Sequence, residues 1–198
     1  MPGRMAGRVA LITGGGGGIG EATGRLFAEE GGAVVLVDRD QATAEAAATG
    51  IRASIPGAKV LAVGADVAQE PEARRVVDEA AQHFGALHTL VNVAGIRFYT
   101  PLAEAGTKEW EQIIGVNLLV TTYCCKAALP HLRRAGNATI VHVSSVFGVI
   151  GRAGMGQYDT TKAAILSQAS SDATSAGSAC GAWALSAAQC VRSSSSSP

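Results

Sequence analysis

Tyr158 and Lys162 are the residues of this chain whose types and spacing point most directly to proton-transfer chemistry. They stand four positions apart, so on a helix they share one face. An ammonium group beside a phenol stabilises the phenolate, which lets a tyrosine act as a general acid or base. The same spacing also occurs on solvated helix faces, so the pair alone leaves both interpretations open.

A second candidate site is the segment 14–20, in which six of seven residues are glycine. It follows a short apolar run and precedes a helical pattern. Backbone N–H groups at a helix N-terminus bind phosphate, and glycines keep that approach free of side chains. Glu21 and Ala22 stand where a nucleoside-triphosphate loop needs Lys followed by Ser or Thr, which disfavours that loop type. The context favours the pyrophosphate of a dinucleotide over an ordinary flexible turn.

Asp38 lies 18 residues after Gly20, at the end of the next apolar run. At about this spacing a carboxylate accepts hydrogen bonds from the adenosine ribose hydroxyls, and it would repel a 2′-phosphate. We therefore expect NAD as the cofactor rather than NADP, although the neighbouring Arg39 could tolerate a phosphate. Taken alone, an aspartate here is more typical of a turn at a strand end.

Apolar runs alternate with helical patterns along the first 168 residues. This alternation predicts an α/β fold with a doubly wound parallel sheet and helices on both faces. The expected strands are residues 8–13, 33–37, 59–63, 87–91 and 139–143, and the expected helices are residues 21–30, 41–54, 71–84, 108–132 and a segment from about 158 to 166.

The composition excludes several classes of function. Sixteen Lys and Arg balance sixteen Asp and Glu, which argues against a basic nucleic-acid surface or a polybasic membrane anchor. The sequence also shows no signal-peptide pattern and no run near the roughly 20 apolar residues of a membrane span. The four cysteines and four histidines show no metal-ligand spacing. We expect a cytoplasmic, globular protein without a metal.

Further short motifs accompany the glycine segment and the Tyr-Lys pair. In chain order the full set is Thr13-Gly14-x-x-x-Gly18-x-Gly20, Asp66-Val67, Asn92-x-Ala94-Gly95, Asn117, Ser144-Ser145 and Tyr158-x-x-x-Lys162. Together they resemble the short-chain dehydrogenase/reductase family, classical NAD(P)-dependent type, over residues 8 to about 166. The resemblance implies a Rossmann-like fold and an oxidoreductase that transfers a hydride between a nicotinamide cofactor and a secondary alcohol or ketone.

The resemblance also implies a role for each matching residue. Tyr158 would be the general acid/base, and Lys162 would hold the nicotinamide ribose. Ser145 would hydrogen-bond the substrate oxygen, and Asn117 would support a water linked to Lys162. The residues expected to contact the cofactor are Gly14, Gly18, Ile19, Gly20, Asp38, Asp66, Val67, Asn92, Ala94, Tyr158 and Lys162. Members of the family act on small alcohols or carbonyls and usually form homodimers or homotetramers.

The chain departs from the family pattern at two places. Val93 replaces the second asparagine of the usual Asn-Asn-Ala-Gly motif. After about residue 166 the family's C-terminal strand and substrate loop are not recognisable. We therefore predict a cofactor-binding domain over residues 1–168 and a poorly ordered Ser/Ala/Gly-rich tail without strands over residues 169–198. Two further hypotheses follow, namely that the tail is a frameshifted reading and that the chain is a truncated, inactive homologue that binds NAD weakly or not at all.

Overall fold

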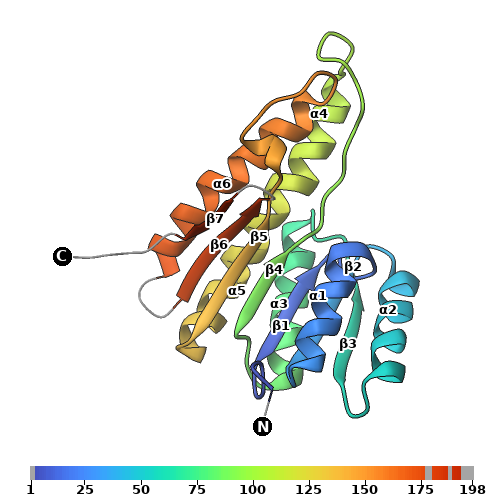
Figure 1. Ribbon diagram of the computed structural model, residues 1–198, viewed down its shortest axis with the longest axis vertical. Coiled ribbons are helices and arrows are strands. Elements are labelled where there is room, and N and C mark those ends of the chain that lie inside the picture. Colours follow the sequence, from blue (N-terminus) through green and yellow to red (C-terminus); the bar gives the residue numbers. More distant parts are fainter. Residues whose placement is uncertain (1–2, 177–179, 187–188, 193–198) are drawn as a thin grey trace, which may run out of the picture.

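A single sheet organises the chain, and the computed structural model describes residues 3–176, 180–186 and 189–192 of it, with side chains up to residue 171. The strand order is β3-β2-β1-β4-β5-β6-β7, and every neighbouring pair is parallel except β6 with β7 (Figure 1). The strands are β1 (Val9–Thr13), β2 (Ala33–Asp38), β3 (Lys59–Gly64), β4 (Thr89–Asn92), β5 (Ala138–Val143), β6 (Cys180–Ser186) and β7 (Gln189–Arg192).

Helices connect each pair of successive strands from β1 to β6 and cover both faces of the sheet (Figure 1). They are α1 (Gly18–Glu29), α2 (Gln41–Ser54), α3 (Glu70–Phe84), α4 (Thr107–Ile114), the π-helix η1 (Gly115–Leu119), α5 (Val120–Ala135), the short 3₁₀ helix η2 (Val146–Gly148) and α6 (Gly156–Ala176). The predicted helices are therefore present, with shifted ends and a π-helical turn inside the long one.

The side chains of β1 show how the two faces differ. Val9 and Leu11 pack in a core cluster with residues of α3 and α5, whereas Ala10 and Ile12 pack in a second cluster with residues of α1 and α2. Successive side chains of a strand point to opposite faces, so a strand covered on both sides must be apolar throughout. This arrangement confirms the predicted doubly wound parallel sheet.

The strand order reverses between β1 and β4, because the chain winds outward from β1 to β3 and then returns to start the other half at β4. In a doubly wound sheet, ligands bind outside the carboxyl ends of the strands at such a reversal. The segments that follow β1, β2 and β4 are thus the first places to look for a site.

The segment Thr107–Ala135 is a continuous helical stretch of 29 residues that is long and apolar enough to cross a membrane by length and composition. No such stretch was predicted from the sequence. Within it, Cys124, Ala128 and Leu132 are fully buried against the sheet. The core helix of a globular domain passes the same test, and these three residues belong to the domain core.

The structure differs most from the prediction after residue 168. The sequence predicted no strand there, but α6 continues to Ala176 and is followed by β6 and β7. Strand β6 pairs with β5 over six positions, from Ala138 with Cys180 to Val143 with Leu185. This pairing supplies hydrogen-bonding partners to a β5 edge that would otherwise be open. The segment was missed because it is rich in Ser, Ala and Gly and because β6 contains none of the β-branched residues typical of strands.

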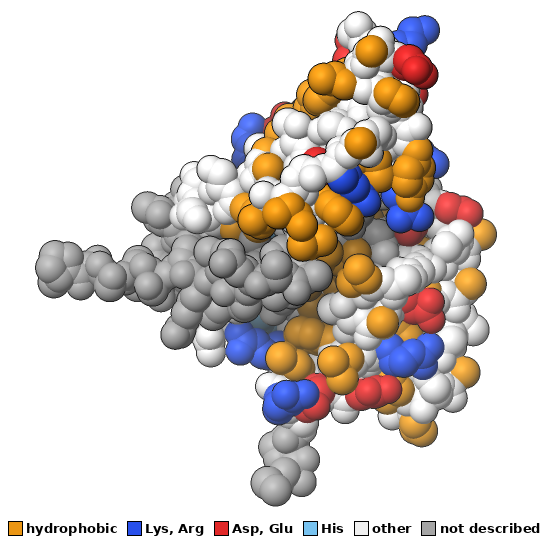
Figure 2. Space-filling view, turned by 45° about the horizontal axis from the view of Figure 1, so that its top comes forward, with side chains coloured by type: hydrophobic (Ala, Val, Ile, Leu, Met, Phe, Trp, Pro, Cys, Tyr) orange, Lys and Arg blue, Asp and Glu red, His pale blue; other side chains and the backbone are white. Residues whose placement is uncertain are grey.

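Acidic and basic side chains are interspersed on the face shown in Figure 2, as the zero net charge of the chain suggests. Large apolar side chains are also exposed, among them Tyr99 and Leu102 after β4, and Val149 and Ile150 after η2. These segments follow the carboxyl ends of β4 and β5, at the sheet edge where this fold class binds ligands.

Candidate active site

The glycine loop between β1 and α1 is shaped by close approaches that only glycine allows. A Cβ atom on Gly20 would lie 2.0 Å from the carbonyl oxygen of Gly14, and a Cβ on Gly16 would lie 2.8 Å from Oδ2 of Asp38. The loop therefore folds tightly against the start of α1 and against the end of β2. Its backbone stands at the positive end of the helix dipole, where an anionic pyrophosphate is stabilised.

Asp38 ends β2 and faces this loop. Its Oδ2 accepts a hydrogen bond of 3.1 Å from the Gly16 N–H, and its Oδ1 accepts one of 3.3 Å from the Asp40 N–H. The carboxylate is thus held at the mouth of a cleft of about 200 Å³. That cleft is lined by residues from the ends of four strands and the long helix: Gly14, Val37, Asp38, Arg39, Asp66, Val67, Ala68, Ala94, Gly95, Ile96, Val116 and Val120.

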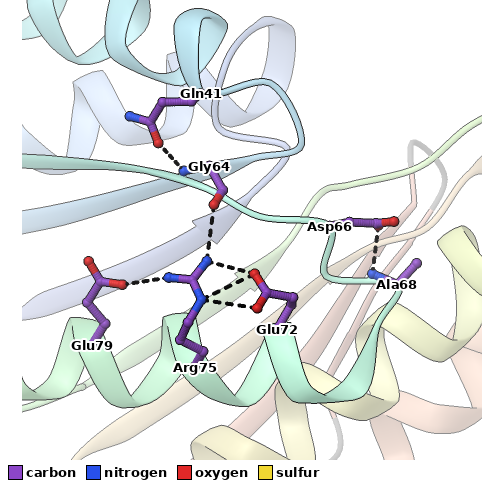
Figure 3. Close-up of polar contacts among 7 residues, drawn as sticks. All are labelled: Gln41, Gly64, Asp66, Ala68, Glu72, Arg75 and Glu79. Carbon is purple, nitrogen blue, oxygen red and sulfur yellow. Dashed lines mark hydrogen bonds and ion pairs between the residues drawn. The ribbon is translucent and has the colours of Figure 1, made fainter.

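The turn after β3 carries Asp66 into the cleft. Asp66 Oδ1 accepts a hydrogen bond of 3.1 Å from the Ala68 N–H (Figure 3). Next to this turn, Arg75 of α3 donates to the Gly64 carbonyl at 3.1 Å and pairs with Glu72 and Glu79 at 2.8 and 2.9 Å. The Arg75 guanidinium lowers the pKa of Glu72 through their hydrogen bonds. These contacts tie the end of β3 to α3 and so fix the turn that presents Asp66.

The end of β4 is fixed by Thr13 of β1. Its Oγ1 accepts hydrogen bonds of 3.1 Å from the Val93 N–H and 3.2 Å from the Ala94 N–H. Asn92 points elsewhere: it is 3% exposed, and its Nδ2 lies 3.2 Å from Nδ1 of His142 and 3.7 Å from Sγ of Cys125. The side chain of Asn92 therefore faces the core, so its predicted contact with a cofactor would have to come from its backbone.

Asn117 lies in the π-helical turn η1 and is fully buried. Its Oδ1 accepts from the Ile96 N–H at 2.8 Å, and its Nδ2 donates to the Ile96 carbonyl at 3.0 Å and to Oγ1 of Thr161 at 3.1 Å. Single π-turns inside α-helices are frequent at functional sites, where they redirect a side chain. Here the side chain joins the loop after β4 to α6, directly beside Lys162.

Tyr158 and Lys162 lie one turn apart on α6, as their spacing predicted. Nζ of Lys162 is 5.7 Å from the centroid of the Tyr158 ring and donates a hydrogen bond of 2.8 Å to the Val143 carbonyl. Lys162 is only 4% exposed, and this burial lowers its pKa from the usual 10.5 to about 8. The spacing left two interpretations open, and the burial of Lys162 excludes one of them, a solvated helix face.

The two serines that follow β5 differ in their contacts. Ser144 is buried, and its hydroxyl donates to the Lys162 carbonyl at 2.6 Å. Ser145 is half-buried, caps η2 and accepts a hydrogen bond of 3.2 Å from the Phe147 N–H. Among the described residues, no hydrogen bond joins Ser145 to Tyr158. The serine and the tyrosine thus reach the site from separate elements, β5 and α6.

Three contributors to the site escaped the sequence analysis. Thr161 is 2% exposed and joins Asn117 to the Tyr158 carbonyl, to which it donates at 2.8 Å. Thr13 belongs to the glycine motif but had no predicted role, and its hydroxyl fixes the backbone after β4. Arg152 lies over the Tyr158 ring at 5.4 Å. The position of Thr161 next to Lys162 was a usable signal, whereas Arg152 lies in a loop with no pattern to mark it.

The other predicted cofactor-binding residues lie in the cleft of Asp38 or at the start of α1. Gly14, Asp38, Asp66, Val67 and Ala94 line one cleft together. Ile19, in the first turn of α1, is 59% exposed, and Gly18 begins that helix. Within the described part of the chain there is no group of three or more His, Cys, Asp or Glu side chains arranged to hold a metal ion.

Comparisons of the sequence and the fold with known proteins identify the family of this chain. The family model for short chain dehydrogenases matches residues 8–177. The chain belongs to the short-chain dehydrogenase family. The match continues past residue 166, where recognisable motifs end. Among solved structures, an NAD⁺-bound xylitol dehydrogenase superposes with a TM-score of 0.88 at 28% sequence identity, covering 92% of this chain and 70% of the other.

Two curated dehydrogenases resemble this chain in sequence, with 38% and 40% identity. A 2,5-dichloro-2,5-cyclohexadiene-1,4-diol dehydrogenase of Sphingobium indicum is 38% identical over 165 residues, covering 83% of this chain. A cis-4-hydroxycyclohexanecarboxylate dehydrogenase of Sinomonas cyclohexanicum is 40% identical over 162 residues, covering 81% of this chain. The chain spans 65% and 64% of the lengths of these two relatives.

Proposed function

We propose that this chain is an NAD-dependent oxidoreductase that transfers a hydride between the nicotinamide and a secondary alcohol or ketone, with Tyr158 as the general acid/base. The observation that carries the proposal is the buried Lys162, whose Nζ stands 5.7 Å from the Tyr158 ring. Tyr158 is tied through Thr161 and Asn117 to the loop after β4, which also lines the cleft of Asp38. Proton-transfer groups and a dinucleotide cleft thus share one edge of the sheet.

The residues present fit an NAD molecule. At Gly16 and Gly20 a Cβ atom would collide with Asp38 and with the Gly14 carbonyl, so glycine lets the loop fold tightly onto the start of α1, where a pyrophosphate would bind. Asp38 would accept hydrogen bonds from the adenosine ribose, and Asp66 and Val67 would hold the adenine, with Ala94, Gly14, Gly18 and Ile19 along the cofactor. A carboxylate at position 38 supports NAD over NADP, because it would repel a 2′-phosphate. The exposed Arg39 beside it is the residue that would soften this preference.

In the proposed reaction the bound nicotinamide supplies or accepts the hydride. Tyr158 gives a proton to the carbonyl oxygen during reduction and takes it from the alcohol during oxidation. Lys162 stabilises the phenolate and, with three N–H donors, can hold the nicotinamide ribose while keeping its bond to Val143. Ser145 donates a hydrogen bond to the substrate oxygen, and Asn117 supports a water linked to Lys162.

The substrate class is a second part of the proposal. The relatives named above are dehydrogenases of a cyclic diol and of a hydroxycyclohexanecarboxylate. Exposed apolar side chains of the loops after β4 and η2, such as Leu102 and Val149, suit the ring of such a compound. We therefore expect cyclic secondary alcohols and their ketones to be better substrates than charged acyclic ones.

The test is NADH oxidation with a panel of cyclic and acyclic ketones, and NAD⁺ reduction with the matching alcohols. We expect turnover with at least one cyclic compound, loss of turnover in Tyr158→Phe, and a preference for NAD that weakens in Asp38→Ala. A folded chain that turns over no member of the panel with either cofactor would overturn the proposal.

The competing hypothesis is an inactive homologue that binds NAD weakly or not at all. It is favoured by one observation, that the motifs of the family are not recognisable after about residue 166. Calorimetric titration with NAD separates the two, because the oxidoreductase must bind the cofactor. A sharp thermal transition that NAD raises would exclude the non-binding form of this alternative.

A further inference from the structure

Arg152 occupies a position between the two elements that carry Ser145 and Tyr158. It lies in the loop from η2 to α6, and its guanidinium carbon is 3.6 Å from the centroid of the Phe147 ring and 5.4 Å from that of the Tyr158 ring. Both distances are within the range of cation–π attraction. One side chain therefore contacts an aromatic ring of η2 and the tyrosine of α6.

Asp159 holds this arginine in place. Its Oδ2 accepts a hydrogen bond of 3.0 Å from the Arg152 N–H, and its Oδ1 forms an ion pair of 3.4 Å with Arg152 Nε. The Asp159 side chain is only 9% exposed and that of Arg152 is 29% exposed. Neither Oδ1 nor Nε has a hydrogen-bond partner within the described residues. Removing either partner would leave a largely buried charge uncompensated, which is costly.

Two cations that are anchored on different elements thus lie near the Tyr158 ring. Lys162 is fixed by its bond to the Val143 carbonyl at the end of β5. Arg152 is fixed by Asp159 and by its stacking on Phe147. Because the Phe147 N–H donates to Ser145 Oγ, the aromatic residue that Arg152 stacks on also contacts Ser145.

We propose that Arg152, held by Asp159, is a positioning residue that fixes the ring of Tyr158 relative to Ser145. The inference rests on the proposed function, in which these two hydroxyls meet one substrate oxygen. Neither Arg152 nor Asp159 needs to touch the substrate. Their effect on the rate comes from alignment, and small misplacements of a catalytic group are known to slow a reaction strongly.

The kinetic test compares Arg152→Met, Arg152→Lys and Asp159→Asn with the wild type. We expect Arg152→Met to lower kcat roughly tenfold or more with KM changed by less than about twofold, because alignment rather than binding is lost. Lysine keeps the charge but not the planar group that stacks on Phe147, so the kcat of Arg152→Lys should lie between those of the wild type and Arg152→Met. Arg74→Met and Asp78→Asn are the matched controls and should leave kcat unchanged, because Arg74 and Asp78 pair with each other on α3 and Asp78 with His131 of α5, and none of these three residues belongs to the site.

A second measurement does not depend on turnover. The chain has three tyrosines, so Tyr158→Phe identifies the Tyr158 ring signals in an NMR spectrum of selectively labelled protein. A cross-peak between the Arg152 side chain and this ring should be present in the wild type and in Asp78→Asn, and lost in Asp159→Asn.

The two measurements separate the two proposals. An active wild type with an unchanged kcat in Arg152→Met would overturn the positioning role, as would a cross-peak that survives in Asp159→Asn. An inactive wild type would overturn the proposed function alone, because the cross-peaks still decide whether Asp159 and Arg152 fix the ring.

Discussion

Lys162 is the clearest case of a single residue that serves the site at the expense of the fold. Its pKa is lowered by burial from 10.5 to about 8, so the folded state holds this proton less tightly than the unfolded chain. Below pH 8 both states are protonated, and the buried charge costs about 3 kcal/mol of folding free energy. As the pH rises from 8 to 10.5 the folded state is neutral first, so this cost disappears.

We therefore predict that Lys162→Met is stabilised relative to the wild type at pH 7, and that the difference in unfolding free energy falls by about 3 kcal/mol by pH 10.5. Urea unfolding of both proteins at several pH values between 7 and 10.5 measures it. Lys126→Met, which removes an exposed lysine, should change the unfolding free energy little throughout. A difference between Lys162→Met and the wild type that does not vary with pH would contradict the prediction.

The glycine loop offers a matched pair of substitutions at the same scale. In Gly20→Ala the new Cβ would lie 2.0 Å from the Gly14 carbonyl oxygen, so the loop must open. At Gly17 a Cβ meets no atom within 4 Å, and the φ angle of −174° suits any residue. Overpacking of this kind costs about 1–3 kcal/mol, so we predict that Gly20→Ala lowers the free energy of unfolding by about this amount and that Gly17→Ala changes it little. Urea unfolding compares the two variants, and equal free energies of unfolding would contradict the prediction.

At the scale of the elements, the π-helical turn η1 carries Asn117, the residue that joins the loop after β4 to α6. Fully buried Asn117 makes three hydrogen bonds from this turn, two to the backbone of Ile96 and one to Thr161. We predict that Asn117→Ala destabilises the chain by about 2–3 kcal/mol, because buried backbone groups lose their partners. Faster amide exchange should appear at Ile96 in particular. Asn137→Ala, at an exposed asparagine before β5, is the control, and equal effects of the two substitutions would refute this role of Asn117.

The sequence predicts helices and strands well where the hydrophobic pattern agrees with the Pro and Gly residues that mark their ends. β1 reads as a continuous apolar run because it is covered on both faces, and α3 is bounded by Pro71 near its start and Gly85, with φ of +80°, at its end. The turn η1 could not be foreseen, because the π-helical geometry leaves the apolar spacing of the long helix nearly unchanged. Arg152 and Thr161 escaped for a different reason, since their partners come from other elements that only the fold brings close.

At the scale of the whole molecule, the segment after residue 168 decides how much of the chain belongs to the domain. Its composition predicts a poorly ordered tail, and that prediction of disorder stands untested, whereas the structure pairs β6 with β5 over six positions. If this pairing contributes to the fold, its removal leaves the hydrogen-bonding groups of β5 at an open edge. The two views therefore differ in what a deletion should do.

We predict that deletion of residues 177–198 destabilises the chain by several kcal/mol and promotes association through the exposed β5 edge. The reason is that a buried parallel strand loses both its ladder partner and the cover of its edge, as an unprotected strand edge is a site of intermolecular pairing. Deletion of residues 193–198 alone keeps β6 and β7 and is the matched control. Urea unfolding and light scattering on the three chains measure the effect. If both deletions leave stability and association unchanged, residues 177–198 are a tail of the kind that their composition predicts, and the domain ends with α6.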